Sequence, residues 1–214
     1  MSRTTIPIFI VLLALTFDQI LKIWIKTTMM LGEEINVIGN WFILHFTENN
    51  GMAFGMEFGG NTGKIILTLF RIIAIGGLIW YLVHLNKTKA PKGYVISISF
   101  ILAGAIGNII DSVFYGMIFN DSFNQVASMF PEGGGYTGVL RGKVVDMLYF
   151  PVLKGNFPDW FPFKASEPFI FFRPVFNIAD SCVTIGVMLI LLFQRKFFQS
   201  EEKDSKVEEI PENS

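Results

Sequence analysis

The sequence has little of the side-chain chemistry that most metal centres and cysteine-dependent sites use. Its 214 residues contain a single cysteine, Cys182, which excludes an internal disulfide and a cysteine-ligated metal site. The two histidines, His45 and His84, are too few and too far apart in sequence to indicate a metal cluster. A formal net charge of −1 gives no sign of nucleic-acid binding. Any chemistry must come from carboxylates, amides or lysines, and we expect neither a metal nor a cofactor.

Apolar residues, in contrast, are abundant. Hydrophobic residues make up 51% of the chain, 23 residues are phenylalanine, and the mean hydropathy is +0.49. A membrane-spanning helix needs about 20 apolar residues, and four segments reach that length: 6–25, 65–85, 94–115 and 178–198. We therefore predict an α-helical polytopic membrane protein with four transmembrane helices. Residues 1–200 would form one membrane domain, and the acidic segment 201–214 would be a disordered cytoplasmic tail.

Two stretches between the spans have the composition of extramembrane regions. In residues 31–62, segments 35–40 and 41–46 predict two short strands around a Gly39-Asn40 turn. Residues 117–175 form a long region rich in glycine, proline and aromatic residues. Basic residues gather in the short loop 86–93 and after the last span, so the positive-inside rule places both termini in the cytoplasm. Both extramembrane stretches would then lie outside.

Ionisable residues in the spans fall at one membrane face in this topology. Charged side chains inside spans are costly and usually functional. Four spans that each place such a group at the same depth indicate a polar site at the outer leaflet. The residues concerned are Asp18, Lys22, Arg71, Asp111 and Asp180.

Asp180 lies at the head of the last span, in the segment 176–181. A carboxyl group at this depth is a functional candidate. The alternative is structural, because Asn177 could be the N-cap and Asp180 the third residue of a capping box that stabilises the helix start. From this stretch alone the two interpretations are about equally supported.

Spacing brings other polar residues onto common helix faces. Asp18 and Lys22 are four residues apart and can pair, which favours a mostly structural role. Asn108 and Asp111 are three residues apart and also share a face. Asp146 follows an apolar pair, which suits an element at the membrane surface, although spacing alone favours an exposed loop carboxylate.

Two aspartates brought together at a partly dry interface could hydrolyse a peptide bond. Their like charges prevent both from ionising, so one acts as a base toward water and the other as an acid. Such hydrolysis needs no metal and no serine or cysteine nucleophile. The developing oxyanion needs hydrogen-bond donors, and three asparagine side chains could supply them: Asn49, Asn108 and Asn177.

Five short motifs, in order along the four spans, together resemble those of lipoprotein signal peptidase (signal peptidase II), the aspartyl enzyme of bacterial inner membranes. Each motif alone is weak, but the set covers nearly the whole chain and is highly specific. The motifs are Asp18-x-x-x-Lys22, Asn49-x-Gly51-x-Ala53-Phe54-Gly55, Gly104-Ala-x-Gly107-Asn108-x-x-Asp111, Val144-Val145-Asp146 and Phe176-Asn177-x-Ala179-Asp180.

The resemblance implies that Asp146 and Asp180 form the catalytic dyad. It also implies a small extramembrane β-cradle after the first span and an extended loop before the last span that helps to cover the substrate. The implied substrate is a diacylglyceryl-modified prolipoprotein, cut just before its lipidated cysteine, and globomycin-type cyclic peptides would inhibit as blocked substrate mimics. Membrane lipid would be the other partner. The implied supporting or substrate-binding residues are Asp18, Lys22, Asn49, Gly51, Asn108, Asp111, Asn177 and Ala179.

The sequence departs from the family pattern in two places. The family usually has arginine directly after the position of Asp111, where this chain has Ser112. Gly116 fits a glycine of the family motif, but an insertion at about 117–141 then delays Asp146. We hypothesise that Arg141, within this insertion, replaces the missing guanidinium. A second extension, about 153–167, carries aromatic residues that could anchor in the interface or simply form a packed surface loop: Trp160, Phe161 and Phe163.

Two functions from other classes remain open on the sequence alone. A small four-helix transporter or channel component would use Asp18, Asp111 and Asp180 as ion or proton relays. It would not need the extramembrane stretches, and its acids would lie nearer the middle of the bilayer. A non-catalytic assembly factor would tolerate changes at Asp146 and Asp180.

Overall fold

A computed structural model gives the fold of residues 2–51, 60–156, 168–171 and 173–208. The chain forms two compact units, and the first helix contributes to both of them. Unit 1 comprises residues 1–19, 61–110 and 178–214. Unit 2 comprises residues 20–60 and 111–177.

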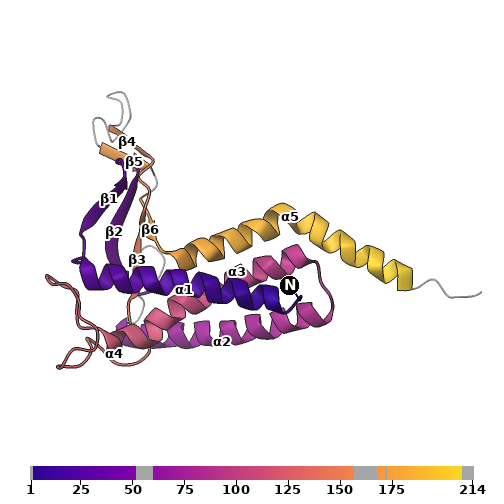
Figure 1. Ribbon diagram of the computed structural model, residues 1–214, viewed down its shortest axis with the longest axis horizontal. Coiled ribbons are helices and arrows are strands. Elements are labelled where there is room, and N and C mark those ends of the chain that lie inside the picture. The colour runs from indigo at the N-terminus through magenta and orange to yellow at the C-terminus, as the bar shows by residue number, and fades with distance from the viewer. Residues whose placement is uncertain (1, 52–59, 157–167, 172, 209–214) are drawn as a thin grey trace, which may run out of the picture. The chain divides into compact units, whose positions relative to one another are not determined.

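Among the described residues, four helices are long and apolar enough to cross a membrane (Figure 1). They confirm the predicted class of polytopic helical membrane protein. Helix α3 is followed directly by a π-helical turn, η2 (Asp111–Tyr115), and the short helix α4 (Gly116–Ile118), which complete the third span. The long helices are α1 (Thr5–Thr28), α2 (Gly60–Lys87), α3 (Lys92–Ile110) and α5 (Ile178–Glu208).

Helix α3 is the most buried of the spans, and α5 packs along it in unit 1. Close approach of these two helices requires glycine. A Cβ atom on Gly104 would lie 2.2 Å from the carbonyl oxygen of Ala179, and one on Gly186 would lie 2.6 Å from that of Ser97. Many side chains on the other spans are exposed and apolar, as with Ile73 of α2. Such side chains are the surface that a lipid-facing helix presents.

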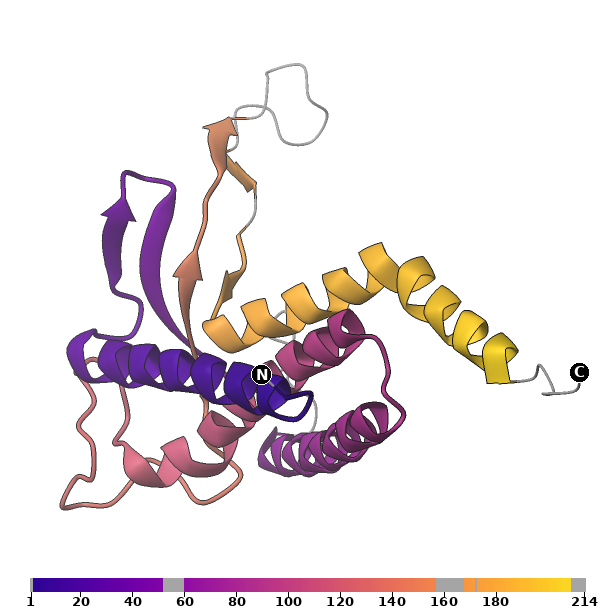
Figure 2. The same ribbon diagram turned by 45° about the vertical axis from the view of Figure 1, so that its right-hand side comes forward.

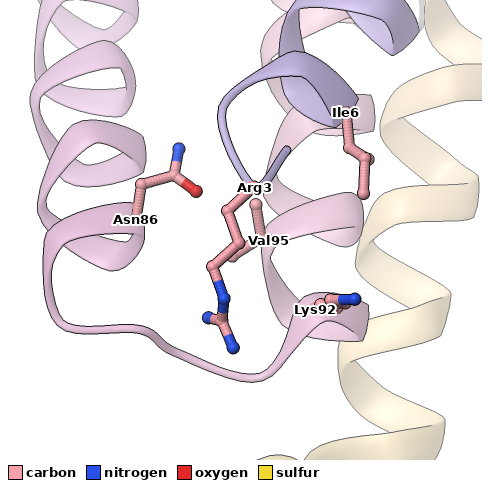
Figure 3. Close-up of a pocket in the computed structure, with 5 residues that line it drawn as sticks. All are labelled: Arg3, Ile6, Asn86, Lys92 and Val95. Atoms are coloured by element: carbon pink, nitrogen blue, oxygen red, sulfur yellow. The ribbon is translucent and has the colours of Figure 1, made fainter. Parts of the chain in front are cut away.

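The chain start lies beside the loop that joins α2 to α3 (Figure 1). The Arg3 guanidinium donates a hydrogen bond of 2.8 Å to the carbonyl oxygen of Ala90 in that loop. Figure 3 shows Arg3 between Asn86 and Lys92, where these side chains line a small depression at this end of unit 1. Basic side chains therefore gather at the ends of α1, α2 and α3 that the sequence assigns to the cytoplasm.

Unit 2 contains an antiparallel sheet in the order β1-β2-β3-β6. The β1–β2 hairpin (Figure 2) confirms the two strands predicted after the first span, and Gly39 in its turn has a φ of 52° that suits glycine. The predicted strands covered residues 35–40 and 41–46. The strands in the structure are β1 (Glu34–Ile38) and β2 (Phe42–Asn49). The strands that complete the sheet are β3 (Val144–Tyr149) and β6 (Val175–Phe176).

The two insertions have different structures. Residues 119–143 are largely irregular and return to the π-helical turn, where the Gly142 amide donates a 2.8 Å hydrogen bond to the carbonyl oxygen of Ser112. The second extension begins and ends in a separate two-stranded sheet of β4 (Leu153–Asn156) and β5 (Pro168–Phe171). Trp160, Phe161 and Phe163, for which interfacial anchoring was hypothesised, lie outside the described residues.

The last helix is longer than the sequence predicted. Its membrane-spanning part covers Ile178–Arg195, but the helix continues to Glu208, into the segment predicted to be a disordered tail. Glutamate and lysine are good helix formers, so the composition of this segment suits an extension of α5. Residues 209–214 lie outside the described part of the chain.

Candidate active site

Strand β3 carries Asp146, and its two neighbouring strands fix the position of this residue in unit 2. Thr47 of β2 lies opposite Asp146, and Phe176 of β6 lies opposite Leu148 two residues further on. The Asp146 side chain is only 4% exposed. Asp146 is therefore on a paired central strand, and the interpretation as an exposed loop carboxylate is wrong.

Asn177 holds the Asp146 carboxylate. Its Nδ2 donates a 2.7 Å hydrogen bond to Oδ1 of Asp146 and a second, of 3.3 Å, to the carbonyl oxygen of Val145. Asn177 directly follows β6 and directly precedes α5, so the pairing of β6 with β3 sets its place. The buried amide both orients the carboxylate and compensates part of its desolvation.

A buried ion pair binds the backbone of Val145, the residue that precedes Asp146 on β3. Lys22 and Asp111 approach to 2.9 Å, and both side chains are fully buried. The same Asp111 oxygen accepts a 3.2 Å hydrogen bond from the backbone amide of Val145. Lys22 supplies the cation that the buried carboxylate of Asp111 needs, and the pairing of Lys22 with Asp18, four residues earlier, stays a prediction.

In unit 1, Asp180 lies in the first turn of α5 and is held by a second asparagine. Nδ2 of Asn108 donates a 2.7 Å hydrogen bond to Oδ1 of Asp180. Asn108 is on α3, the helix against which α5 packs. The side chain of Asp180 is half-buried.

Asp18 caps the start of α5 from a distant part of the sequence. Its Oδ1 accepts a 2.9 Å hydrogen bond from the backbone amide of Ala179, 161 residues away. A carboxylate at this position also interacts favourably with the positive end of the helix dipole. Gln19 donates to the other Asp18 oxygen at 3.1 Å and to the carbonyl oxygen of Gly107 at 3.3 Å. Asp18 is thus a scaffold residue for the helix that carries Asp180.

A cavity of about 360 Å³ opens beside Asp180 in unit 1. Three helices line it, and each of them contributes at least one polar side chain among small or apolar residues. The lining residues are Arg71 and Ala74 of α2, Gly104, Ala105 and Asn108 of α3, and Asp180, Val183 and Thr184 of α5.

The motif around Asn49 forms a tight turn at the end of β2. Oδ1 of Asn49 accepts a 2.8 Å hydrogen bond from the Gly51 amide, and Gly51 has a φ of 86°, a conformation that favours glycine. Asn49 pairs with Val144 of β3, so this turn begins beside the strand that carries Asp146. Ala53, Phe54 and Gly55 lie outside the described residues.

A buried polar cluster joins the first insertion to α1 and β2. No motif or spacing in the sequence predicts this cluster. Lys26 forms an ion pair with Glu48 and donates a 2.8 Å hydrogen bond to the hydroxyl of Ser122. Lys143 donates to the other Glu48 oxygen at 2.9 Å. The Lys26 ammonium also lies over three aromatic rings, at 5.9, 5.5 and 5.2 Å from the ring centres of Phe46, Phe119 and Tyr136.

The cluster perturbs the acidity of its members. Burial raises the pKa of Glu48, but the ammonium groups of Lys26 and Lys143 outweigh burial, so the pKa lies below its ordinary value of 4.5. Burial raises the pKa of the Tyr136 hydroxyl well above its ordinary value. That hydroxyl accepts a 2.6 Å hydrogen bond from the backbone amide of Lys143. The cluster is therefore a fixed, charged support for β2 and the insertion.

Each unit brings together its own group of predicted site residues. Unit 2 gathers Asp146, Asn177, Asp111 and Lys22, while unit 1 gathers Asp180, Asn108, Asp18 and Ala179. Arg141 lies in the segment whose backbone bonds to Ser112. Arg71, which the sequence places among the ionisable residues of the polar site without a role of its own, lies in the cavity wall. Sequence reasoning did not assign Lys26, Glu48 and Lys143 to the site.

These features define a polytopic membrane protein whose asparagine-held carboxylates suit acid–base chemistry. A family model described as signal peptidase (SPase) II matches residues 10–196. The chain belongs to this signal peptidase II family.

Similar proteins agree with the assignment. A lipoprotein signal peptidase of Porphyromonas gingivalis is 51% identical over 86% of this chain and 80% of its own length. One of Amoebophilus asiaticus is 39% identical over 95% of this chain and 84% of its own length. A solved structure described as a bacterial membrane enzyme is 28% identical, with a TM-score of 0.55 over 97% of this chain and 94% of the other.

Replacing Glu48 by glutamine should lower the stability of unit 2 by about 3 kcal/mol at neutral pH, because it leaves buried cations without their anion. The folded-state pKa of Glu48 is depressed, so its contribution is present above 4.5 and lost as pH falls through the folded-state value. Unfolding of the purified protein in detergent, followed at pH values from about 3 to about 8, would measure both the loss of stability and its dependence on pH.

The matched control is Glu34→Gln on the neighbouring strand. The Glu34 side chain is 49% exposed and pairs with His45, and such surface pairs contribute about 0–1 kcal/mol. Equal effects of the two substitutions, or a difference that grows in acid, would contradict the assignment of Glu48 as a buried anion.

Proposed function

We propose that this protein is an aspartyl endopeptidase that removes the signal peptide from diacylglyceryl-modified prolipoproteins, with Asp146 and Asp180 as its two catalytic carboxylates. Its membership of the signal peptidase II family and the names of its relatives support the reaction. The bond cut would be the one just before the lipidated cysteine.

The observation that carries the choice of residues is that the two aspartates are held in the same way. Each accepts a 2.7 Å hydrogen bond on Oδ1 from the Nδ2 of an asparagine, Asn177 for Asp146 and Asn108 for Asp180. Asn177 also lies three residues before Asp180 in the chain. An amide donor stabilises the ionised carboxylate and fixes its rotation, which is what an acid–base group needs in order to meet a substrate in one geometry.

The proposed mechanism needs the two carboxyl groups close enough to share one proton. The ionised aspartate takes a proton from a water molecule, whose oxygen attacks the carbonyl carbon of the scissile bond. The protonated aspartate then gives its proton to the leaving amine as the carbon–nitrogen bond breaks. Asparagine amides near the site would stabilise the oxyanion that forms in between.

The composition of the cavity beside Asp180 supports the proposal that the substrate is linked to a lipid. Its wall combines the carboxylate of Asp180 and the amide of Asn108 with small and apolar residues such as Ala105 and Val183. A signal peptide in the membrane would bring its scissile bond to such a site along with the diacylglyceryl group, which stays in the bilayer. The rival proposal of an ion relay leaves the sheet around Asp146 without a role.

We further propose that both termini are cytoplasmic and that the catalytic groups face the outer leaflet. The basic loop 86–93 supports this orientation, as do Arg195 and Lys196 at the end of the spanning part of α5. In sealed right-side-out vesicles, added protease should cut within residues 119–143 and leave tags at both termini intact. Digestion of either tag from outside would overturn the orientation.

Asp146→Asn and Asp180→Asn should each reduce cleavage by at least about 100-fold, because each keeps the shape of the side chain but removes its acid–base chemistry. Purified protein would be incubated with a diacylglyceryl-modified prolipoprotein, and the released signal peptide quantified. Asp121→Asn is the matched control, since the Asp121 side chain is 47% exposed and its nearest cation, Lys143, is 3.9 Å away.

The outcomes of this experiment separate the alternatives. Activity that survives in Asp146→Asn would indicate Asp111 as the partner of Asp180. Absence of cleavage by the wild type would favour the ion relay or the assembly factor, and full activity in both variants would mean that neither aspartate is catalytic. In the same assay a globomycin-type cyclic peptide should block cleavage, and unchanged turnover at saturating peptide would contradict a shared binding site.

We also propose that Arg141 supports the site in place of the arginine that is usual at position 112. The hydrogen bond from Gly142 to Ser112 brings the insertion to the turn that contains Asp111. Arg141→Ala should therefore lower kcat by about 10-fold or more, the usual size of a lost charged hydrogen bond, while Arg141→Lys should retain part of the rate. Intact activity in Arg141→Ala would refute this role.

A further inference from the structure

The cavity beside Asp180 contains one charged side chain that no motif assigns. Of the eight described residues that line the cavity, Arg71 alone is a cation and Asp180 alone is an anion. Arg71 comes from α2, while Asp180 comes from α5 and its amide partner Asn108 from α3. Three helices of unit 1 therefore each supply at least one polar group to the same cavity, and Thr184 of α5 adds a hydroxyl.

An arginine at this place in a span needs a reason. Its neighbours along α2, Phe70 and Ile72, are exposed and apolar, as expected for a lipid-facing surface. Arg71 and Asp180 line the same cavity, so the guanidinium and the carboxylate, which carry opposite charges, attract one another. A guanidinium in a membrane helix persists where a partner or a polar cavity compensates its charge, and such residues usually serve the function of the protein.

We propose that Arg71 is a positioning residue for hydrolysis, which holds the Asp180 carboxylate ionised and oriented toward the cavity. This inference rests on the proposed function. The Asn108 amide fixes Asp180 through Oδ1, and a planar, permanently charged guanidinium across the cavity adds a second restraint and a positive field. With Arg71 beside it, Asp180 is the member of the pair that accepts the proton from water.

Arg71 is distinct from Arg141 in both place and task. Arg141 belongs to unit 2 and to the insertion that returns to Ser112, whereas Arg71 belongs to unit 1 and the wall of the Asp180 cavity. We therefore expect that substitution of one arginine leaves the contacts of the other unchanged. This separation allows each arginine to be tested alone.

The first test measures kcat and KM separately for variants of Arg71. Arg71→Gln should lower kcat by about 10- to 100-fold with KM changed less than about threefold, because the lost interaction acts on the aspartate and not on bound substrate. Arg71→Lys, which keeps the charge, should recover much of the rate. A raised KM at unchanged kcat would make Arg71 a substrate-binding group and overturn the proposal.

Two controls make this result specific. Lys64→Gln removes another buried cation of α2 that does not line the cavity, and it should leave kcat unchanged. Arg71→Met provides a second neutral variant that suits an apolar span, in case the glutamine variant does not fold. An equal loss of kcat in Lys64→Gln, or normal kcat in folded Arg71→Met, would overturn the role.

A second measurement does not depend on catalysis. The stabilities in detergent of the wild type, Arg71→Gln, Asp180→Asn and the double variant form a double-mutant cycle. If the two groups interact, the double variant should lose clearly less than the sum of the single losses. Additive losses would overturn the proposal. If the wild type cleaves no lipidated precursor while the cycle shows coupling, the proposed function fails and the Arg71–Asp180 interaction stands.

Discussion

A buried charge must be compensated by a partner of opposite charge. In unit 2 the ion pair between Lys22 and Asp111 meets this requirement, and the elements around Asp146 depend on it. Both side chains are fully buried at 2.9 Å from one another, so removing either one would leave an uncompensated charge. Asp111 also binds the backbone amide of Val145, which ties the π-helical turn to β3. The position of Asp146, the next residue along that strand, depends on this pair and on the strands at either side.

The two asparagines solve the same problem for the two aspartates. Asn177 holds Asp146 in unit 2, and Asn108 holds Asp180 in unit 1. An amide can donate to a carboxylate without adding charge, so each aspartate is oriented and remains able to gain or lose a proton. A lysine in direct contact, like Lys22 at 2.9 Å from Asp111, would instead fix the ionised form, whereas Arg71 acts on Asp180 only from the wall of the shared cavity. The choice of partner thus separates the carboxylates proposed to react from the carboxylate that supports them.

The parts of this structure that could be predicted from sequence are those that depend on local pattern. The four spans follow from runs of apolar residues, and the β1–β2 hairpin follows from two short strand-like runs around Gly39. The candidate carboxylates could be selected because a charge within or beside a span is costly. The family motifs then distinguished Asp146, whose spacing alone favoured an exposed loop.

The contacts that could not be predicted join residues far apart in sequence. Asp18 caps the amide of Ala179 across 161 residues, and Ser122 meets Lys26 across 96. Local spacing instead suggested a pair between Asp18 and Lys22, because helical neighbours are the only partners that a one-dimensional pattern reveals. Arg71 could be recognised from sequence as an ionisable residue within a span, but only the packing of α2, α3 and α5 places it in the wall of a cavity.

The first insertion is best understood through its contacts with the rest of unit 2. Its residues Ser122 and Lys143 bind Glu48 of β2, and Glu48 pairs with Val145 in the sheet register. Its end bonds to Ser112 in the π-helical turn. The insertion therefore contacts both elements that border Asp146, the strand on one side and the turn on the other. Added length at this point in the chain would ordinarily loosen a site, because a longer loop has more conformational freedom to lose. Here a buried ion cluster and three aromatic rings around Lys26 hold the insertion against α1 and β2.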